Sequence, residues 1–365
     1  MCIRDSYYDA SVTLNLRQQP EGGELRHQVQ VHVLLDDALT ESEIYLLVHG
    51  FNNHRGEAEL AYQGFRDRQT EQLNGSQYRH LRKQLRDTFW PGDAAWVQPL
   101  DYLDFMVYPK SVGTARDAGT KLADFLTGLN SLAVVHFIGH SLGCRVVLET
   151  IREISSRNQA HMVGKVCLMA AAVPIFMLND GARLDQAAFA PKKILNLLSK
   201  SDRVLHYAFP PGQTAAGPGF SEGFFPDALG RHGMIHPSIT NRAVLKARHG
   251  DYWGHRGHGG SDKGRRGVFT NKLIAELFGW NFLKQRVIDD RQVAYERDTR
   301  GLRDQVEEKT HACLFAAIQR QGRSLALETE GEVCVRRSAR SHQSNTTDQP
   351  ARRPCHPIAY PDPAF

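Results

Sequence analysis

Residues 134–143, with the sequence VVHFIGHSLG, constrain the fold more than any other part of the chain. The segment begins as a run of apolar and β-branched residues, which is typical of a strand covered on both faces of a sheet. It ends in a Gly-x-Ser-x-Gly pentapeptide. Residues 144–154 follow with apolar side chains at the three- and four-residue spacing of a helix. A strand, this pentapeptide and a helix, in that order, are the sequence form of a nucleophile elbow.

The two glycines of the pentapeptide have a steric reason. Ser141 must lie on a turn so tight that its backbone is strained, and Gly139 and Gly143 lack the Cβ atoms that would clash there. We therefore predict that Ser141 is a nucleophile at the end of a buried strand. A Gly-rich turn in an unrelated α/β protein is the alternative that the motif alone leaves open.

Strand-like and helix-like segments alternate along most of the chain. This alternation predicts an α/β fold, with a mostly parallel central sheet and helices on both of its faces. Residues 209–231, rich in Gly, Pro and aromatics, predict either a lid or an irregular surface loop. We expect strands at residues 28–35, 43–48, 93–98, 134–138, 165–172, 193–198 and 243–247, and helices at 56–87, 111–129, 144–154, 179–189 and 268–278.

Composition excludes several classes of partner and cofactor. A net charge of +5 is modest for 365 residues, and with no concentrated basic stripe we expect no nucleic-acid partner. No stretch approaches the ~20 apolar residues of a membrane span, so we expect no integral membrane segment. The six cysteines show neither a C-x-x-C pair nor zinc spacing, so we expect a reducing, cytoplasmic location and no metal. We expect no other cofactor.

A serine hydroxyl needs a base within hydrogen-bond reach, and the base needs an orienting acid. In a parallel sheet such groups gather at the carboxyl ends of strands. Asp202 follows the expected strand 193–198 by a short loop, and we predict it as the acid. The alternatives are a purely structural aspartate that caps the next segment, or Asp180 as the acid, with Asp185 less favoured because it falls inside an expected helix.

His249 opens the sequence HGDYW after the expected strand 243–247, and we predict it as the base. His255 is the second choice. Together with Asp251 and His258 these histidines suggest a metal site. We favour the base because no helix sets these side chains on one face, as in the H-E-x-x-H pattern.

The oxyanion hole of such a site combines two backbone N–H groups. One comes from Leu142, the residue after the nucleophile. The other comes from a loop after an earlier strand. The sequence HGFNN at residues 49–53 follows the expected strand 43–48, so we predict Phe51 as the second donor. We assign supporting roles to His49, Gly50, Asn52 and His140.

With these residues assembled, the chain resembles the α/β-hydrolase superfamily. It is most similar to a bacterial subgroup of domain-of-unknown-function hydrolases that have an HGFNN oxyanion loop and a Trp-Pro motif, here Trp90-Pro91. The resemblance spans residues 28–280 and implies an esterase-like activity with Ser141 as nucleophile, Asp202 as acid and His249 as base. Gly92 follows the Trp-Pro motif where related proteins usually have serine.

We expect three parts in the chain. Residues 1–27 form a poorly ordered segment, of which residues 1–6 resemble a translated sequencing-library adapter, so the absence of a signal peptide says little about location. Residues 28–283 form the α/β-hydrolase domain. Residues 284–365 form a polar and largely disordered extension, since its last part lacks the apolar content to fold.

These residues together predict a serine hydrolase that cleaves a small-molecule carboxylic ester or related acyl substrate through an acyl-enzyme. An acyltransferase or thioesterase with the same triad stays open, because these activities differ only in the acceptor or the leaving group. A non-catalytic binding protein on the same fold is the alternative from another class. The oligomeric state and the acyl and alcohol specificity stay open.

Overall fold

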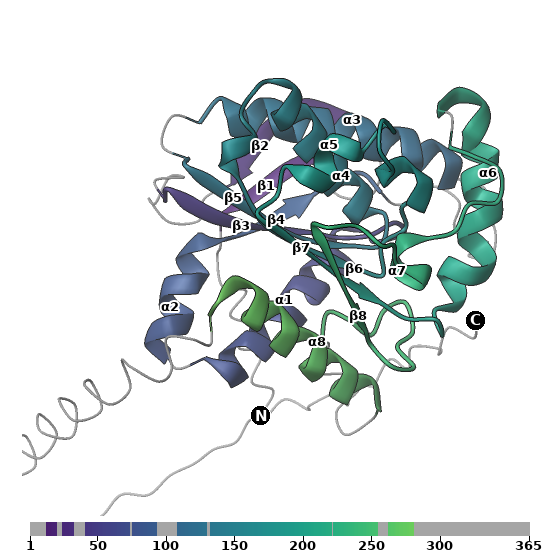
Figure 1. The fold of residues 1–365 in the computed structure, drawn as a ribbon. Helices are drawn as coiled ribbons and strands as arrows, with labels where there is room; N and C mark the ends of the chain where they lie inside the picture. Colours follow the sequence, from purple (N-terminus) through teal and green to yellow (C-terminus); the bar gives the residue numbers. More distant parts are fainter. Residues whose placement is uncertain are drawn as a thin grey trace, which may run out of the picture. The chain divides into compact units, whose positions relative to one another are not determined.

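One sheet of eight strands organises the molecule, in the order β2-β1-β4-β3-β5-β6-β7-β8 (Figure 1). The β1–β2 pair is antiparallel and every other pair is parallel. The strands are β1 Thr13–Arg17, β2 Leu25–His32, β3 Glu43–Val48, β4 Leu85–Phe89, β5 Val134–His140, β6 Val163–Met169, β7 Lys193–Leu198 and β8 Ile239–Ala243.

The computed structural model describes residues 12–19, 24–32, 41–73, 75–92, 108–129, 132–220, 222–254 and 262–280. All of them belong to the compact unit of residues 1–292, and residues 293–365 are a second unit. The helices are α1 Arg55–Gln72, α2 Gly75–Gln84, α3 Tyr108–Thr127, α4 Gly143–Ser156, α5 Asp185–Phe189, α6 Phe209–Phe220, α7 Leu229–His232 and α8 Asp262–Phe278.

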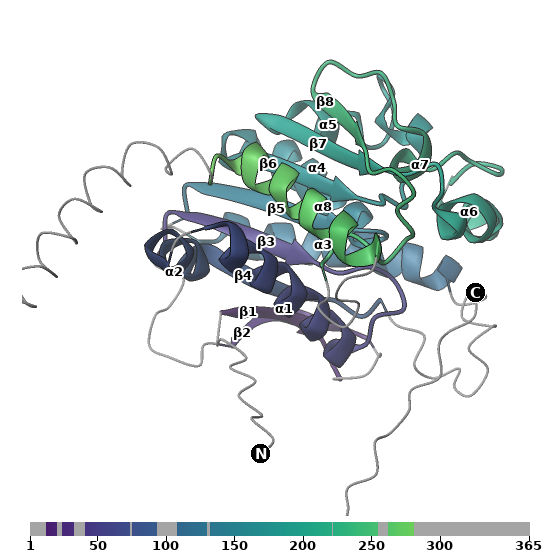
Figure 2. The ribbon, with the colours of Figure 1, turned by 90° about the horizontal axis from the view of Figure 1, so that it is seen from below.

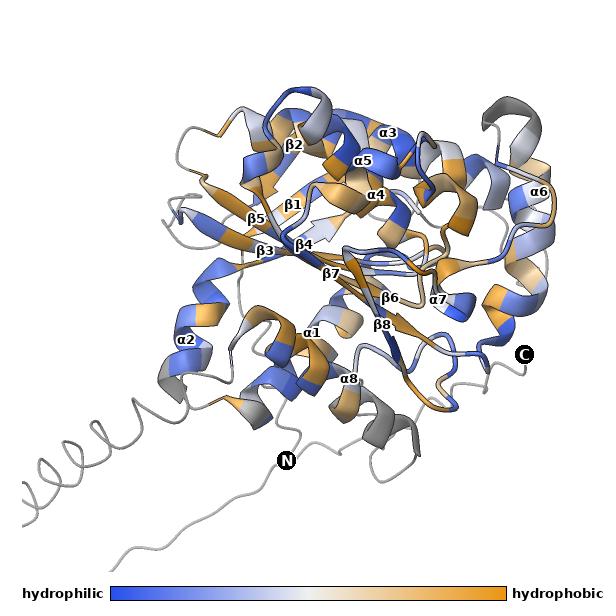
Figure 3. Cartoon of the chain, in the orientation of Figure 1, coloured by the Kyte–Doolittle hydropathy of each residue, from blue (hydrophilic) through white to orange (hydrophobic). Residues whose placement is uncertain are grey.

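Helices cover both faces of the sheet. Seen along its edge, α3, α4 and α5 lie on one face and α1, α2 and α8 on the other (Figures 1 and 2). The central strands are buried and apolar, and they run through the molecule as an orange band in Figure 3. None of the helices described is both long and apolar enough to cross a membrane.

The predicted mostly parallel sheet with helices on both faces is confirmed, and its strand order together with the strand–elbow–helix unit β5–α4 makes this an α/β-hydrolase fold. Among the predicted strands, 43–48 and 193–198 match β3 and β7 residue for residue. The expected strand 93–98 and the expected disordered tail lie outside the described residues.

Two strands escape the sequence prediction because they carry charged side chains. Strand β4 begins inside the expected helix 56–87 and runs two residues beyond its end, and β1 lies inside the segment 1–27 that we expected to be poorly ordered. Both are buried along their whole length. Asp87 of β4 accepts two hydrogen bonds from Arg66 of α1, at 2.6 and 3.0 Å, so the buried charge is compensated. Arg17 of β1 is likewise buried.

Two further expectations need correction nearer the site. The last strand is Ile239–Ala243 rather than 243–247. The apolar Val244 and Ala247 instead pack their side chains into the core from a loop, and the Val244 N–H donates to the carbonyl of Leu198. The segment 209–231 is not wholly irregular, since it contains α6 and most of α7.

Candidate active site

The turn at Ser141 has the strained backbone that its motif predicts. Ser141 has a φ of +53°, a left-handed conformation that a residue with a side chain rarely adopts. A Cβ on Gly143 would lie 2.2 Å from the carbonyl oxygen of His49, and one on Gly139 would lie 3.1 Å from the Cα of Cys144. The glycines therefore let β5, α4 and the loop after β3 meet at one point.

Ser141, His249 and Asp202 form one hydrogen-bonded chain. The Nε2 atom of His249 lies 2.7 Å from Ser141 Oγ, and its Nδ1 atom lies 2.8 Å from Asp202 Oδ2. Because an ionised carboxylate can only accept, Nδ1 carries the ring proton and Nε2 is left to accept the serine hydroxyl proton. The three residues come from the ends of β5 and β7 and from the loop after β8.

The two carboxylate oxygens of Asp202 make different contacts. Its Oδ1 accepts the N–H of Leu205, so it caps the π-helical turn Val204–Ala208, while its Oδ2 faces His249. Asp202 is fully buried. Burial by itself raises the pKa of this carboxyl, but the charge and hydrogen bond of His249, helped by the Leu205 N–H, outweigh it and lower the pKa. Asp202 is therefore ionised in the folded protein at neutral pH.

The loop that carries His249 is tied to the neighbouring strand end. Ser199 donates its hydroxyl proton to the carbonyl of Ala247 at 2.8 Å, which links the end of β7 to this loop. Asp251 accepts the N–H of Arg248 at 2.8 Å and so closes the turn around His249. His140, next to the serine, lies with Nε2 2.7 Å from the carbonyl oxygen of His249. These contacts hold the backbone at His249 and leave both imidazole nitrogens to Ser141 and Asp202.

The loop after β3 passes directly beside the serine. A Cβ on Gly50 would lie 2.8 Å from Ser141 Cβ, so only glycine allows this approach. Asn52 has a φ of +56° and donates its N–H to the carbonyl of Gly92 at 2.7 Å, which fits a turn residue. Phe51 lies between them and is partly exposed. The predicted oxyanion loop is therefore next to Ser141.

The Trp-Pro motif holds this loop from behind. Trp90 donates its backbone N–H to His49 Nε2 at 3.2 Å and its indole N–H to the carbonyl of His49 at 2.8 Å, and the two rings stack. A Cβ on Gly92 would lie 2.5 Å from the indole of Trp90, so this backbone path requires glycine at position 92.

His49 supports the loop as a neutral ring. Complete burial and the nearby guanidinium of Arg17 hold its pKa well below the usual range. Tyr62 accepts the His49 N–H at 2.8 Å and donates to the carbonyl of Thr88, so α1 also anchors the loop. Sequence reasoning missed Arg17 and Tyr62, because nothing in a single side chain on β1 or α1 indicates contact with residue 49. Of Arg17, Tyr62 and Trp90, which all hydrogen-bond to His49, only Trp90 belongs to a motif that the sequence shows, Trp90-Pro91.

The alternative site residues do not join the hydrogen-bonded chain of Ser141, His249 and Asp202. Asp180 is exposed, and Asp185 begins α5 and accepts the N–H of Gly181. His255 and His258 lie outside the described residues. Within the part of the chain that the structure describes, no three His, Cys, Asp or Glu side chains gather as a metal ion would require.

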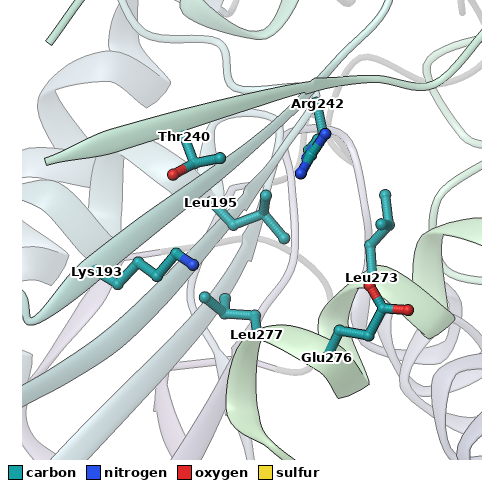
Figure 4. Close-up of a pocket in the computed structure, with 7 residues that line it drawn as sticks. All are labelled: Lys193, Leu195, Thr240, Arg242, Leu273, Glu276 and Leu277. Atoms are coloured by element: carbon teal, nitrogen blue, oxygen red, sulfur yellow. The ribbon is translucent and has the colours of Figure 1, made fainter. Parts of the chain in front are cut away.

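One pocket lies away from this site. It has a volume of about 110 Å³ and lies between β7, β8 and α8, with Lys193, Arg242 and Glu276 around a floor that includes Leu195 (Figure 4). None of the predicted site residues lines it. The pocket is therefore not part of the Ser141 centre.

Comparisons with known proteins add little to this geometry. A family model described as "Protein of unknown function (DUF726)" matches residues 90–215, which include Ser141 and Asp202 and end before His249. No curated protein matches the chain. Two similar solved structures are those of Est1E from Butyrivibrio proteoclasticus, one with bound ferulic acid. They share 12% identity with this chain, cover 66% of it and 91% and 90% of their own length, and have TM-scores of 0.30 and 0.32. Likeness at this level carries no argument about activity.

Proposed function

We propose that the protein is a serine hydrolase that cleaves small carboxylic esters. The observation that carries the proposal is the hydrogen-bonded chain Ser141–His249–Asp202, with distances of 2.7 and 2.8 Å. Its serine has the positive φ of a strained turn. Nucleophile, acid and base follow one another in the order Ser, Asp, His along the chain, which is the order of α/β-hydrolases.

The geometry supports a two-step acyl transfer. His249 Nε2 takes the hydroxyl proton as Ser141 Oγ attacks the ester carbonyl carbon, and Asp202 stabilises the imidazolium that forms. The carbonyl oxygen becomes an oxyanion, for which we propose the backbone N–H groups of Phe51 and Leu142 as donors. His249 then protonates the leaving alcohol as the C–O bond breaks. Water attacks the acyl-enzyme with the same base and releases the carboxylic acid.

The contacts around the triad favour catalysis over mere binding. Asp202 is buried and ionised, the His249 ring is hydrogen-bonded at both nitrogens, and Ser141 has a strained backbone. A group positioned in this way needs no cofactor, and we propose none. A cytoplasmic location and a bacterial source remain predictions from the sequence.

Substitution of the serine tests the proposal directly. We expect Ser141→Ala to lower kcat for a short p-nitrophenyl ester by about 10⁵-fold or more, since the triad acts as a unit. A fluorophosphonate probe should label the wild-type chain at Ser141 and leave the variant unlabelled. Ser156→Ala, an exposed serine at the end of α4, is the matched control and should keep full activity.

Two results would overturn the proposal: unchanged turnover in Ser141→Ala, or a folded wild-type protein that neither hydrolyses esters nor reacts with the probe. Analysis of products with added alcohols and with acyl thioesters then separates hydrolysis from acyl transfer. A series of esters of graded acyl length defines the substrate.

A further inference from the structure

Helix α6 is built from residues that seldom form helices. It follows Asp202 through the π-helical turn Val204–Ala208, and six of its twelve residues are Gly or Pro. Glycine and proline cost about 1 and 3 kcal/mol relative to alanine in a helix interior, so this segment has little tendency to be helical by itself. Contacts with the rest of the molecule must therefore hold it.

The first of these contacts is with Tyr108, the residue that begins α3. A Cβ on Gly212 would lie 2.8 Å from Tyr108 Cδ1, so the helix backbone lies directly against the tyrosine ring. The ring of Phe209 meets the same ring from the side at 6.5 Å. Glycine at position 212 thus has a packing reason, which is close approach to Tyr108.

The second contact is a chain of buried polar side chains. Tyr108 donates its hydroxyl proton to Gln213 Oε1 at 3.0 Å, and the amide of Gln213 donates to Glu222 just beyond the helix. Glu222 also receives both terminal nitrogens of Arg145, each at 3.0 Å. Gln213, Glu222 and Arg145 are each 1% exposed. Burial raises the pKa of Tyr108, so its hydroxyl stays a donor at neutral pH.

Both ends of this chain reach the proposed catalytic machinery. Arg145 lies in the first turn of α4, four residues after Ser141. At the other end the ring of Tyr108 meets the ring of Phe51 edge to face, with centroids 5.4 Å apart. The side chain of Phe51 extends from the residue whose N–H is the proposed oxyanion donor. A fixed ring therefore limits rotation of that peptide unit.

We propose that Tyr108 is a positioning residue that couples the docking of α6 to the placement of the Phe51 oxyanion donor, through Gln213, Glu222 and Arg145. The inference rests on the proposed function, since it assigns a role within the same site. Its consequence is that the segment after Asp202 is a required wall of the site: when α6 is docked, the oxyanion loop is held, and when it is not, Phe51 loses its support.

The buried charges make this docking cooperative. Glu222 has its carboxylate paired with Arg145, and Arg145 also donates its Nε proton to Glu149 at 2.9 Å. Removing one partner of a buried ion pair leaves an uncompensated charge, which is far costlier than the pair itself is favourable. Separation of Glu222 from Arg145, and with it release of the segment just after α6, is therefore disfavoured.

Kinetics of Tyr108 variants test the coupling. We expect Tyr108→Leu, which removes both the ring contact and the hydroxyl, to lower kcat about 30-fold with KM changed less than about 2-fold, because a displaced oxyanion donor acts on the transition state. Binding of a trifluoromethyl ketone, whose adduct with Ser141 carries a charged oxygen, should weaken by the same factor. Tyr108→Phe keeps the ring and should lose about 3-fold in kcat.

Tyr45→Phe is the matched control. The Tyr45 hydroxyl donates to the Glu43 carboxylate at the amino end of β3, away from the Ser141 centre. This substitution should leave kcat and ketone affinity unchanged. A folded Tyr108→Leu protein with wild-type kcat and ketone affinity would overturn the proposal. If that variant does not fold, Tyr108→Phe and Glu222→Gln are combined, and we expect the losses in kcat to be non-additive. Additive losses would overturn the coupling.

The two proposals fail in different ways. An unlabelled and inactive wild-type protein removes the proposed function. A wild-type protein that is labelled at Ser141 and hydrolyses esters, with variants of Tyr108 that behave like Tyr45→Phe, removes only the positioning role.

Discussion

Helix α4 follows Ser141 and α6 follows Asp202, through the turn Val204–Ala208, and the two helices are held in opposite ways. In α4, ten of fourteen residues are buried, and its apolar face packs on β5, β3 and β6. In α6, half of the residues are Gly or Pro, and buried polar bonds to Tyr108 and Glu222 hold it. The first helix is stabilised by its own pattern, the second by partners distant in sequence.

This difference separates what a short motif determines from what the whole fold determines. The elbow requires two small residues around one serine and a buried strand before it. Ten consecutive residues, 134–143, contain this whole motif. The placement of α6 depends on Tyr108, Arg145 and Glu222, which lie on α3, on α4 and beyond α6. Substitutions in the two helices should therefore have effects of different size and sign.

The largest effect is expected at Gly143. Its added Cβ would meet two backbone oxygens, those of His49 at 2.2 Å and Val48 at 2.6 Å, which no side-chain rotation relieves. We expect Gly143→Ala to lower the free energy of unfolding by about 4 kcal/mol or more and to abolish hydrolysis. Urea unfolding and soluble yield measure the first effect. A stable and active Gly143→Ala protein would show that the elbow tolerates a side chain, and the contrast with α6 would fail.

A smaller effect, with a defined pH dependence, is expected at Glu149. This buried residue of α4 binds Arg145, Arg152 and Arg183. Burial by itself raises its pKa, but the hydrogen bond from Arg183 and the charges of Arg145 and Arg183 outweigh it and lower the pKa. Its stabilisation is therefore present above the ordinary value of 4.5 and is lost as the pH falls through the lowered folded value.

We expect Glu149→Gln to cost about 3 kcal/mol at pH 7, because it leaves the buried guanidinium of Arg145 and the partly exposed ones of Arg152 and Arg183 under-compensated, and to cost progressively less as the pH falls below 4.5. Urea unfolding of both proteins between pH 7 and pH 3.5 measures the difference. Glu153→Gln, a more exposed neighbour paired with Arg152, is the control and should cost less than about 1 kcal/mol at every pH. A cost for Glu149→Gln that does not change with pH would contradict the ionic origin.

The sequence predicted the elements whose pattern is local, and the reasons for the misses are physical. Strands β3 and β7 are mostly apolar, and their bounds were predicted correctly. Strand β4 was missed because Arg86 and Asp87 resemble a helix surface, and the ion pair between Asp87 and Arg66 that allows burial joins residues 21 apart. The last strand was shifted because Val244 and Ala247 are buried in a loop.

For the site, the order of motifs predicted which residues the structure brings together, namely Ser141, Asp202 and His249. Their catalytic roles remain proposals. Arg17, Tyr62 and Tyr108 could not be predicted as supports, since each is a single side chain on an element with no motif of its own. Contacts of that kind are set by tertiary packing, and a one-dimensional pattern contains no trace of them.

The smallest effect, and the one of opposite sign, is expected inside α6. A Cβ on Gly217 would lie 3.5 Å from the carbonyl oxygen of Gly223, an ordinary contact, and its φ is not positive. Alanine favours the helix over glycine, but a residue with a Cβ is crowded in a helix when proline follows it, and Pro218 therefore removes part of this gain. We expect Gly217→Ala to raise the free energy of unfolding by at most about 0.5 kcal/mol and leave kcat unchanged. Gly212→Ala in the same helix meets Tyr108 at 2.8 Å and should be destabilising. Thermal unfolding of the pair measures both. If the two alanines acted alike, helix propensity alone would govern α6, and contact with Tyr108 would not be what holds it.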